Sequence, residues 1–547
     1  VQNKVECPLA MIEQGAISGE ARRVTRAAVL ISIGNVTSRV LGLGREMAKS
    51  YLFGASGAVS AFDVASQVPT MFFDQLVGGM LSSSLVPVFS DYARTEDREA
   101  LWQLLGHVFS IVGLLLGALV LLIELVAPWV ARVLGTDLAP EYLALATTMI
   151  RVTAPAILFL NVAGLISAAL YALQRFALPA FTAAVHNATM VVVILLLGRG
   201  GLGPRALAVG LLTATLAQMV FQMPGLGGIR LRFRSLFPLH PGLLQIGTLY
   251  LPIGLGLLAD QLAIALSLNI ASRTGPSGIA WMTYAARLIQ LPLGLVVTAV
   301  SVAILPTLSR YATDANEPAF RATLAQGLRL VLILVLPAAV GLLAMAEPVV
   351  AITLQRGKFL PADTLATANV LRFNILGLVF AALDQPLIFA FYARKDTWTP
   401  ALVGVGTVAL YVLMAALPLR FHEPRLWELI LANSLKLTAH ALLMLYLFTR
   451  KVGGLGPYRV GRTTFVALAA SLAMAFPVFG IQRALQPVVP GGSLGYLIRI
   501  AAATAGGALV YLGLLRLLGV EEVGLIRQAL RQQPALSCGS PAGSLEP

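Results

Sequence analysis

The pattern of apolar and polar positions divides the chain into long apolar segments separated by short polar connections. Crossing a hydrocarbon core about 30 Å thick takes roughly 20 apolar residues in a helix. Such segments lie at 27–53, 62–90, 104–129, 144–172, 179–198 and 206–224, then at 243–271, 279–308, 328–346, 366–392, 400–418 and 428–448, and finally at 462–481 and 494–518. The pattern predicts an all-α polytopic membrane protein with about 14 transmembrane helices.

An internal repeat groups these segments. Residues 61–87 align with 280–306 without a gap at an offset of 219, and both stretches run into similar motifs, Leu85-Val-Pro-Val-Phe-Ser and Ile304-Leu-Pro-Thr-Leu-Ser. Farther on, an offset of 221 relates Arg151, Tyr171, Pro179 and Ala180 to Arg372, Tyr392, Pro400 and Ala401. We therefore expect two duplicated six-helix lobes of the same orientation, related by an axis along the membrane normal, with the substrate site between them.

The repeat and the local composition set the expected boundaries. These are a polar N-terminal segment at 1–26, a first lobe at 27–226, a basic linker at 227–242, a second lobe at 243–450, two further spans within 451–518, and a polar tail at 519–547. The tail is rich in Gln, Ser, Gly and Pro and is expected to be disordered. The N-terminal segment has no short apolar core before a cleavage site, so it does not read as a signal peptide.

Composition supports the membrane assignment and excludes some functions. Hydrophobic residues make up 58% of the 547 positions and charged residues only 12%, against about 25% charged in soluble domains. The net charge of +14 is scattered through loops and spans, so we expect a phospholipid bilayer as partner and no nucleic acid. Cys7 and Cys538 lie in the two polar termini and provide neither a disulfide framework nor a metal site.

Lysines and arginines in the connections predict the orientation. The side that would hold both termini carries well over twice as many of them as the other side. Because basic loops stay in the cytoplasm, both termini are predicted to be cytoplasmic.

Eight cations lie inside the apolar segments: Arg39, Arg45, Lys49, Arg151, Arg287, Arg372, Lys436 and Arg499. A cation at bilayer depth costs at least about 2.5–3.5 kcal/mol, so it normally faces a protein interior or a wet cavity. The excess of cations over acids favours a pathway for an anionic substrate. The alternative is a span-end side chain that reaches the interface, and Arg151 and Arg372 are equally compatible with anchoring their helices.

Several motifs resemble the bacterial lipid II flippase family, MurJ (MviN). They are Ser38-Arg-Val-Leu-Gly-Leu-Gly-Arg-Glu46, Phe53-Gly-Ala, Leu85-Val-Pro-Val-Phe, Trp281-Met-Thr-Tyr-Ala-Ala-Arg-Leu288, Ile304-Leu-Pro-Thr-Leu-Ser and Arg356-Gly-Lys-Phe359. The resemblance implies the fold of the multidrug/oligosaccharidyl-lipid/polysaccharide exporter superfamily: two pseudo-symmetric six-helix lobes in a V around a central cationic cavity, plus two C-terminal helices that form a groove for the lipid tail. It further implies that Arg39, Arg45 and Arg287 bind the diphosphate and headgroup of lipid II, and that the protein moves this lipid to the outer leaflet for cell wall synthesis.

The chain also departs from the family pattern. The family has charged residues where this chain has Ser60, Phe73, Gly78 and Ala286, and an arginine where it has Asp74; Asp63 stands close to one missing acid, on the same helical face. Because of these differences, another polyprenyl-diphosphate-linked glycan is an alternative substrate. A cation-coupled drug antiporter of the same superfamily is a further alternative, although acids rather than cations would then dominate the cavity. A membrane enzyme would need catalytic acids in sizeable loops, and the connections here are mostly short.

Further polar positions are candidates for the cavity wall and for energy coupling. Asp63, Gln67, Thr70 and Asp74 are spaced to share one face of a helix, and we expect Asp63, Gln67 and Asp74 to line the cavity together with Glu46 and Lys49. Asp260 in the seventh span is a candidate site for a coupling cation. The chain has no G-x-x-x-x-G-K-[ST] phosphate loop, so we expect no cofactor, with transport driven by the membrane potential, a monovalent cation or the substrate gradient. We expect the protein to act as a monomer.

Overall fold

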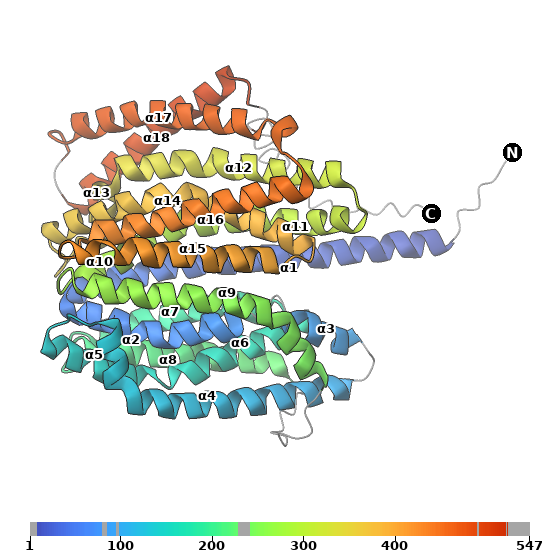
Figure 1. Cartoon of the computed structure of the whole chain (residues 1–547), viewed down its shortest axis with the longest axis horizontal. Coiled ribbons are helices and arrows are strands. Elements are labelled where there is room, and N and C mark those ends of the chain that lie inside the picture. The colour runs from blue at the N-terminus through green and yellow to red at the C-terminus, as the bar shows by residue number, and fades with distance from the viewer. Residues whose placement is uncertain are drawn as a thin grey trace, which may run out of the picture.

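The computed structural model describes residues 8–78, 85–94, 98–227, 241–489, 492–520 and 522. This part of the chain is helical and contains no β-strand. Most helices run side by side along the long axis of the molecule (Figure 1). The predicted basic linker and the polar tail lie almost entirely outside the described residues.

The first half comprises α1 (Pro8–Phe53), α2 (Gly57–Phe73), a π-helical segment η1 (Asp74–Gly78), α3 (Val86–Arg94), α4 (Arg98–Leu134), α5 (Pro140–Thr153), α6 (Ala156–Ala172), α7 (Ala177–Leu197), α8 (Arg205–Gln222) and η3 (Met223–Leu226). Helix α1 continues without a break from residues 8–26 into the first span, so the boundary expected after residue 26 stays a prediction. Polarity does not end a helix, and the Ala, Glu and Arg residues of this segment are good helix formers.

The second half comprises α9 (Pro241–Ser272), α10 (Gly278–Pro292), a π-helical segment η4 (Leu293–Val297), α11 (Thr298–Thr313), α12 (Glu317–Ala344), α13 (Ala346–Leu354), α14 (Pro361–Ala393), α15 (Trp398–Ala416), η5 (Pro418–Arg420) and α16 (Leu426–Val452). A short turn, η6 (Gly456–Tyr458), leads to α17 (Val460–Leu485) and α18 (Ser493–Leu517).

The element boundaries repeat between the halves. The π-helical segments η1 and η4 are separated by the offset of 219 that relates the two sequence blocks, and so are the starts of α4 and α12. The starts of α7 and α15, and those of α8 and α16, are separated by 221. Because a π-helical segment is rare and marks a local irregularity, its recurrence at the same place supports a duplicated ancestry.

Ten helices of the described chain are long and apolar enough to cross a membrane, and eleven if the bent pair α5–α6 counts as one span. The expected single span at 144–172 is this pair, which bends by 40° beside Pro155, a residue that cannot donate a backbone hydrogen bond. The expected spans at 62–90 and 279–308 are each interrupted by a π-helical segment. The total of fourteen therefore stays a prediction.

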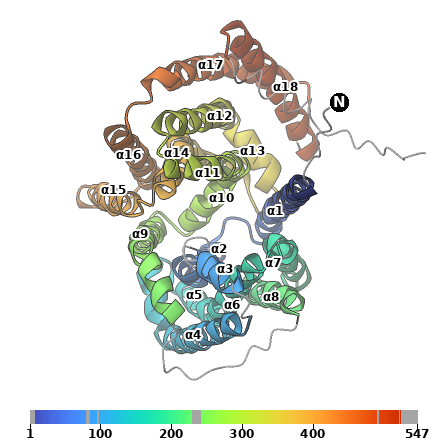
Figure 2. The same cartoon turned by 90° about the vertical axis from the view of Figure 1, so that its right-hand side faces the viewer.

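Viewed along the bundle, the helices form two groups (Figure 2). Helices α2 to α8 form one and α10 to α16 the other, while α1 and α9 lie on opposite sides between them. Helix α1 packs on α7 and also touches α10 and α13, and α9 packs on both α15 and α4. The pair α17–α18 lies outside the second group against α12. One buried apolar cluster extends across both groups.

Candidate functional site

A cavity of about 520 Å³ opens between the two groups. Helices α1, α2, α6, α7 and α8 of the first half form most of its wall, and α10 of the second half contributes Thr283 and Arg287. Its charged lining residues are Arg45, Glu46, Lys49, Asp63, Asp74 and Arg287. The cavity is therefore bounded by side chains from both halves.

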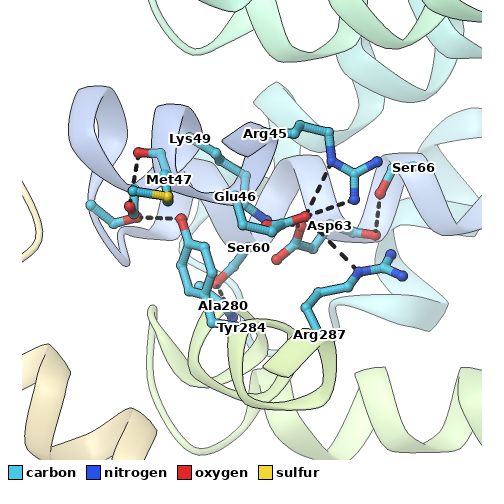
Figure 3. A network of polar contacts seen from close by, with 12 residues as sticks. Arg45, Glu46, Met47, Lys49, Ser60, Asp63, Ser66, Ala280, Tyr284 and Arg287 are labelled. Atoms are coloured by element: carbon cyan, nitrogen blue, oxygen red, sulfur yellow. Dashed lines mark hydrogen bonds and ion pairs between the residues drawn. The ribbon is translucent and has the colours of Figure 1, made fainter. Parts of the chain in front are cut away.

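Glu46 is the centre of an ion-pair network that joins the halves (Figure 3). Its Oε1 lies 2.7 Å from Arg45 Nη2 and 4.0 Å from Arg287 Nε, and its Oε2 lies 2.9 Å from Lys49 Nζ. Lys49 Nζ also lies 3.1 Å from Asp63 Oδ1 and 4.4 Å from the centre of the Tyr284 ring, within range of a cation–π interaction. Residues of α1 and α10 thus meet at the Glu46 carboxylate, and α2 joins the network through the pair of Asp63 with Lys49.

The formal charges of the lining balance, with three cations and three acids, so the cavity is less cationic than the resemblance implies. Exposure distinguishes the two arginines from the other members of the network. The side chains of Glu46, Asp63 and Lys49 are only 6%, 5% and 4% exposed, whereas those of Arg45 and Arg287 are 18% and 45% exposed. The buried carboxylates hold the network together, and the two guanidinium groups face the cavity.

Arg39 is not part of this wall. Its Nη1 donates a hydrogen bond of 2.7 Å to the backbone carbonyl of Gln290, and its guanidinium lies where Gly294 in η4 leaves room, because a Cβ there would overlap it. The Oε1 of Gln290 accepts from Arg287 Nη1 at 3.4 Å. Gln290 thus connects Arg39 to Arg287, and nothing in the sequence singled it out.

Asn187 is a second neutral residue that the sequence did not indicate. Its Oδ1 accepts from Arg45 Nη1 at 3.1 Å, and its Nδ2 donates to the backbone carbonyl of Ser38 at 3.0 Å. Asn187 therefore ties α7 to α1 and fixes the direction of the Arg45 guanidinium.

Backbone and hydroxyl contacts join the halves at the end of the bundle that carries residues 51–57, which we call the Gly54 end. Ser60 Oγ donates to the Pro276 carbonyl at 2.6 Å, and Tyr284 Oη donates to the Gly54 carbonyl at 3.0 Å. The backbone N–H of Lys358 donates to the Tyr51 carbonyl at 3.1 Å. These contacts hold the Gly54 end together beside the cavity.

One predicted lining residue and several predicted charged residues lie outside the cavity. Gln67 is not among the cavity-lining residues, whereas Thr70 and Asp74 on the same helical face are, the latter near Arg287. Arg372 donates to Asn369 at 2.7 Å within its own helix, and Arg151 is exposed. Asp260 is paired with Lys436, Oδ1 to Nζ, at 3.1 Å.

No group of three or more His, Cys, Asp or Glu side chains in the described residues is placed to hold a metal ion. The guanidinium groups of Arg45 and Arg287 suit the binding of an anion, because hydrogen bonds from ionised donors are about twice as strong as those from neutral donors. Arginine also presents its donors in a planar fork that matches phosphate.

Comparison with known proteins gives a consistent result. A family profile described as lipid II flippase MurJ matches residues 49–497. A probable lipid II flippase MurJ of Vibrio cholerae is 29% identical over 517 residues, covering 91% of this chain and 97% of the relative. The lipid II flippase MurJ of Burkholderia cenocepacia is 30% identical over 391 residues, covering 70% and 76%.

Solved structures show the same fold. One described as lipid II flippase MurJ in an inward closed conformation superposes with a TM-score of 0.75 at 22% identity, covering 92% of this chain and 100% of the other. A multidrug resistance MATE family transporter of the MOP superfamily, in an inward-facing conformation, has a TM-score of 0.66 at 14% identity, covering 78% and 99%.

Proposed function

The chain belongs to the MurJ family of lipid II flippases, and from that premise we propose that it moves lipid II across the bacterial inner membrane. The passenger is a saccharide and peptide carried on a polyprenyl diphosphate, and it passes from the cytoplasmic to the outer leaflet for peptidoglycan synthesis. The protein is a transporter and not an enzyme, so no covalent bond of the lipid changes.

The observation that carries this proposal is the pair of guanidinium groups at the cavity wall. Arg45 comes from the first half and Arg287 from the second, and both are held by Glu46. A diphosphate between them would replace part of the hydration it loses on leaving water with charge-assisted, bidentate hydrogen bonds. Because the two arginines belong to different lobes, bound diphosphate would also favour the state in which the lobes are together.

The rest of the wall suits the saccharide and peptide. Hydroxyl, imidazole and amide groups from α2, α6, α7 and α8 line the rest of the cavity: Ser66, Thr70, Ser167, Thr182, His186, Asn187 and Gln218. Such neutral donors and acceptors can orient a polar ligand by hydrogen bonds without a charge requirement. This division supports a diphosphate at the lobe interface and a polar headgroup directed into the first lobe.

Transport would proceed by rocking of the two lobes about the cavity. The Gly54 end is held by the contacts of Ser60, Tyr284 and Lys358, and breaking them would open the cavity on that side. We assign the Gly54 end to the outer face and both termini to the cytoplasm. The membrane potential or a monovalent cation would supply the energy without a bound cofactor.

The polyprenyl tail would remain against the α17–α18 pair. Large apolar side chains of these helices are exposed in the described structure, and the largest exposed fractions belong to Leu517 at 83%, Phe476 at 80% and Leu509 at 75%. An apolar surface on helices that pack outside the second lobe is suited to a lipid chain in the bilayer. The protein would act as a monomer, since one chain supplies both lobes.

Reconstitution into liposomes tests the proposal. We expect the protein to carry fluorescent lipid II across the bilayer, and Arg45→Ala and Arg287→Ala to slow this by at least about tenfold, since one charged hydrogen bond contributes about 1.5–3 kcal/mol. Arg151→Ala is the matched control, because this arginine also lies in an expected span but is exposed and outside the cavity. Equal transport by all three variants would refute the binding site. Faster transport of an undecaprenyl-diphosphate-linked polymer than of lipid II would reassign the substrate.

A further inference from the structure

The second lobe carries two acid–base pairs that the lipid-binding cavity does not use. On α16, Lys436 Nζ lies 3.1 Å from Asp260 Oδ1 of α9, and His440 Nδ1 lies 2.7 Å from Asp384 Oδ1 of α14. Lys436 and His440 are four residues apart, so they point to the same side of α16. None of the four residues lines the 520 Å³ cavity.

Both pairs lie well inside membrane spans. The helices that hold them, α9, α14 and α16, are among those long and apolar enough to cross a membrane. At 1.5 Å per residue, Asp384 is about 14 Å from the end of α14 and His440 about 18 Å from the end of α16. Ionisable groups at this depth are costly and typically mark substrate, ion or proton pathways.

The two pairs differ in how they respond to protons. The imidazole of His440 has two ring nitrogens that can each hold a proton, so it can bind or release one proton while the other nitrogen keeps its hydrogen bond to Asp384; the lysine–aspartate pair has no such group. With Asp384 ionised, its carboxylate only accepts, so Nδ1 of neutral His440 carries the hydrogen and Nε2 has the free lone pair. The His440–Asp384 pair then carries one negative charge, which a single proton on Nε2 would cancel.

The surroundings leave Nε2 available for that proton. It has no hydrogen-bond partner in the described part of the chain, and it faces α15 at Gly404, where a Cβ would be 3.9 Å away. The side chains of His440 and Asp384 are 13% and 16% exposed, so the pair is mostly buried but a small part of each side chain remains accessible. Pro386, two residues after Asp384, interrupts the backbone hydrogen bonds of α14 at this level.

Several other charged groups on the helices around the pair have partners of their own. Helix α9 contributes Asp260, held by Lys436, and α15 contributes no charged side chain. On α14, Tyr392 lies near Asp384, and Arg372 and Arg394 bond Asn369 and Glu317. On α10, α11 and α12, Arg287 faces Glu46, Arg310 lies over Tyr311, and Arg329 pairs with Glu522. Within the described residues, Asp384 is the only ionic partner of His440.

We propose that the His440–Asp384 pair is the proton-binding site of the transport cycle, with Nε2 of His440 taking up and releasing one proton per cycle. The inference rests on the proposed transport function and identifies the coupling ion as H⁺. It makes transport sensitive to the membrane potential, because the proton reaches a site inside the bilayer.

The contacts of α16 and α9 provide the link from the proton to the lobes. Protonated His440 would stand one helical turn from Lys436, and like charges at this spacing repel. That repulsion would weaken the Lys436–Asp260 bridge between α16 and α9. Helix α9 in turn contacts the first lobe, where Gln75 Nε2 donates to the Gly254 carbonyl at 2.9 Å. Gln75 follows the cavity residue Asp74 in η1.

The test compares the wild type with His440→Gln and Asp384→Asn in liposomes that contain fluorescent lipid II. His422→Gln is the matched control, because His422 also faces a carboxylate, Glu428 at 3.6 Å, but is 42% exposed at the end of the bundle. Flipping is measured at equal pH on both sides between about pH 5.5 and 8. It is then measured with an imposed pH gradient while potassium and valinomycin hold the potential at zero.

We expect wild type and His422→Gln to change rate by up to about tenfold per pH unit on one side of the transition and to accelerate in the gradient. His440→Gln and Asp384→Asn should flip lipid II at a rate that neither pH nor the gradient changes. A pH-independent wild type, or a His440→Gln variant that keeps the wild-type pH dependence, would overturn the proton site. Binding of lipid II in detergent is measured in parallel: failure of the wild type to bind and flip would refute the transport function itself, whereas flipping without pH dependence refutes only the proton site.

Discussion

Replacement of Glu46 by glutamine should weaken the fold more than any other single change in the cavity wall. The side chain is 6% exposed and meets Arg45 at 2.7 Å and Lys49 at 2.9 Å, with Arg287 at 4.0 Å. Glutamine has nearly the same shape but no charge, so the variant isolates the electrostatic contribution. Without the carboxylate, Arg45, Lys49 and Arg287 would repel one another, and the cost would be greatest for Lys49, whose side chain is 4% exposed.

Removing one partner of a buried ion pair costs about 3–5 kcal/mol because the remaining charge is left uncompensated. We expect the lower end of that range for Glu46→Gln, since Lys49 keeps Asp63 at 3.1 Å and Arg45 keeps Asn187 at 3.1 Å. The free energy of unfolding in mixed micelles, followed by tryptophan fluorescence, would measure the loss. Glu124→Gln in α4 is the control, because Glu124 makes no ion pair in the described structure. It should change stability by less than about 0.5 kcal/mol.

A double-mutant cycle decides whether the charge is responsible. Lys49→Met removes one of the cations that Glu46 compensates, so the two substitutions together should cost less than the sum of their separate costs. A coupling of about 0.5–3 kcal/mol is expected for residues in one network. If the separate losses simply add, Glu46 does not hold the network through its charge, and the account of the cavity wall given above is wrong.

Three further predictions follow from individual contacts. Gly294→Ala should displace Arg39 from its place beside η4 and remove its 2.7 Å bond to the Gln290 carbonyl, lowering the free energy of unfolding by about 1.5–3 kcal/mol. Gly34→Ala should cost about 1–3 kcal/mol, because the added methyl group would overlap the Ala180 carbonyl where α1 crosses α7. Gly44→Ala in the same helix meets nothing within 4 Å and should leave stability equal or raised. Outside the spans, burial of the Asp396 carboxyl alone would raise its pKa, but hydrogen bonds from Lys451 and from the hydroxyl and backbone N–H of Thr399 lower that pKa below 3.8. The stability this provides is complete above pH 4 and is lost as the pH falls through the lowered pKa, so Asp396→Asn should flatten the pH dependence of unfolding below about pH 4.

The buried charges were predictable because a charge in an apolar span is expensive and therefore conspicuous. Arg45, Lys49 and Arg287 stood out for that reason, and the structure brings them to one carboxylate. Gln290 and Asn187 gave no such signal, since neutral polar residues are tolerated in spans and their roles depend on which helix lies opposite. The pairing of Asp260 with Lys436 was likewise hidden, because the two residues are far apart in the sequence.

The separation of Arg39 from Arg45 follows from helix geometry. At about 100° per residue, six residues turn the helix by about 240° net, so the two side chains leave α1 in directions about 120° apart. Arg45 and Lys49, four residues apart, lie on one face and both reach Glu46. Arg39 instead reaches the Gln290 carbonyl and the Gly294 gap. The family resemblance groups three arginines as one set, whereas the helical period separates them into two places with different chemistry.

The two halves share the same arrangement of helices but carry different polar residues. Helices α8 and α16 start 221 residues apart, so His440 corresponds to Met219 and, at the same offset in α6 and α14, Asp384 corresponds to Ala163. The first lobe thus has apolar residues where the second has its acid–base pair. Conversely, the first lobe provides most of the cavity wall, and the second adds only Thr283 and Arg287. Duplication of a symmetric pair allows such a division, since each copy preserves the packing while only one needs each polar site. If the division is functional, Met219→His would add an imidazole to the first lobe outside the cavity without making transport more sensitive to pH, because α8 has no counterpart of the Lys436–Asp260 bridge through which a proton on α16 would act on α9.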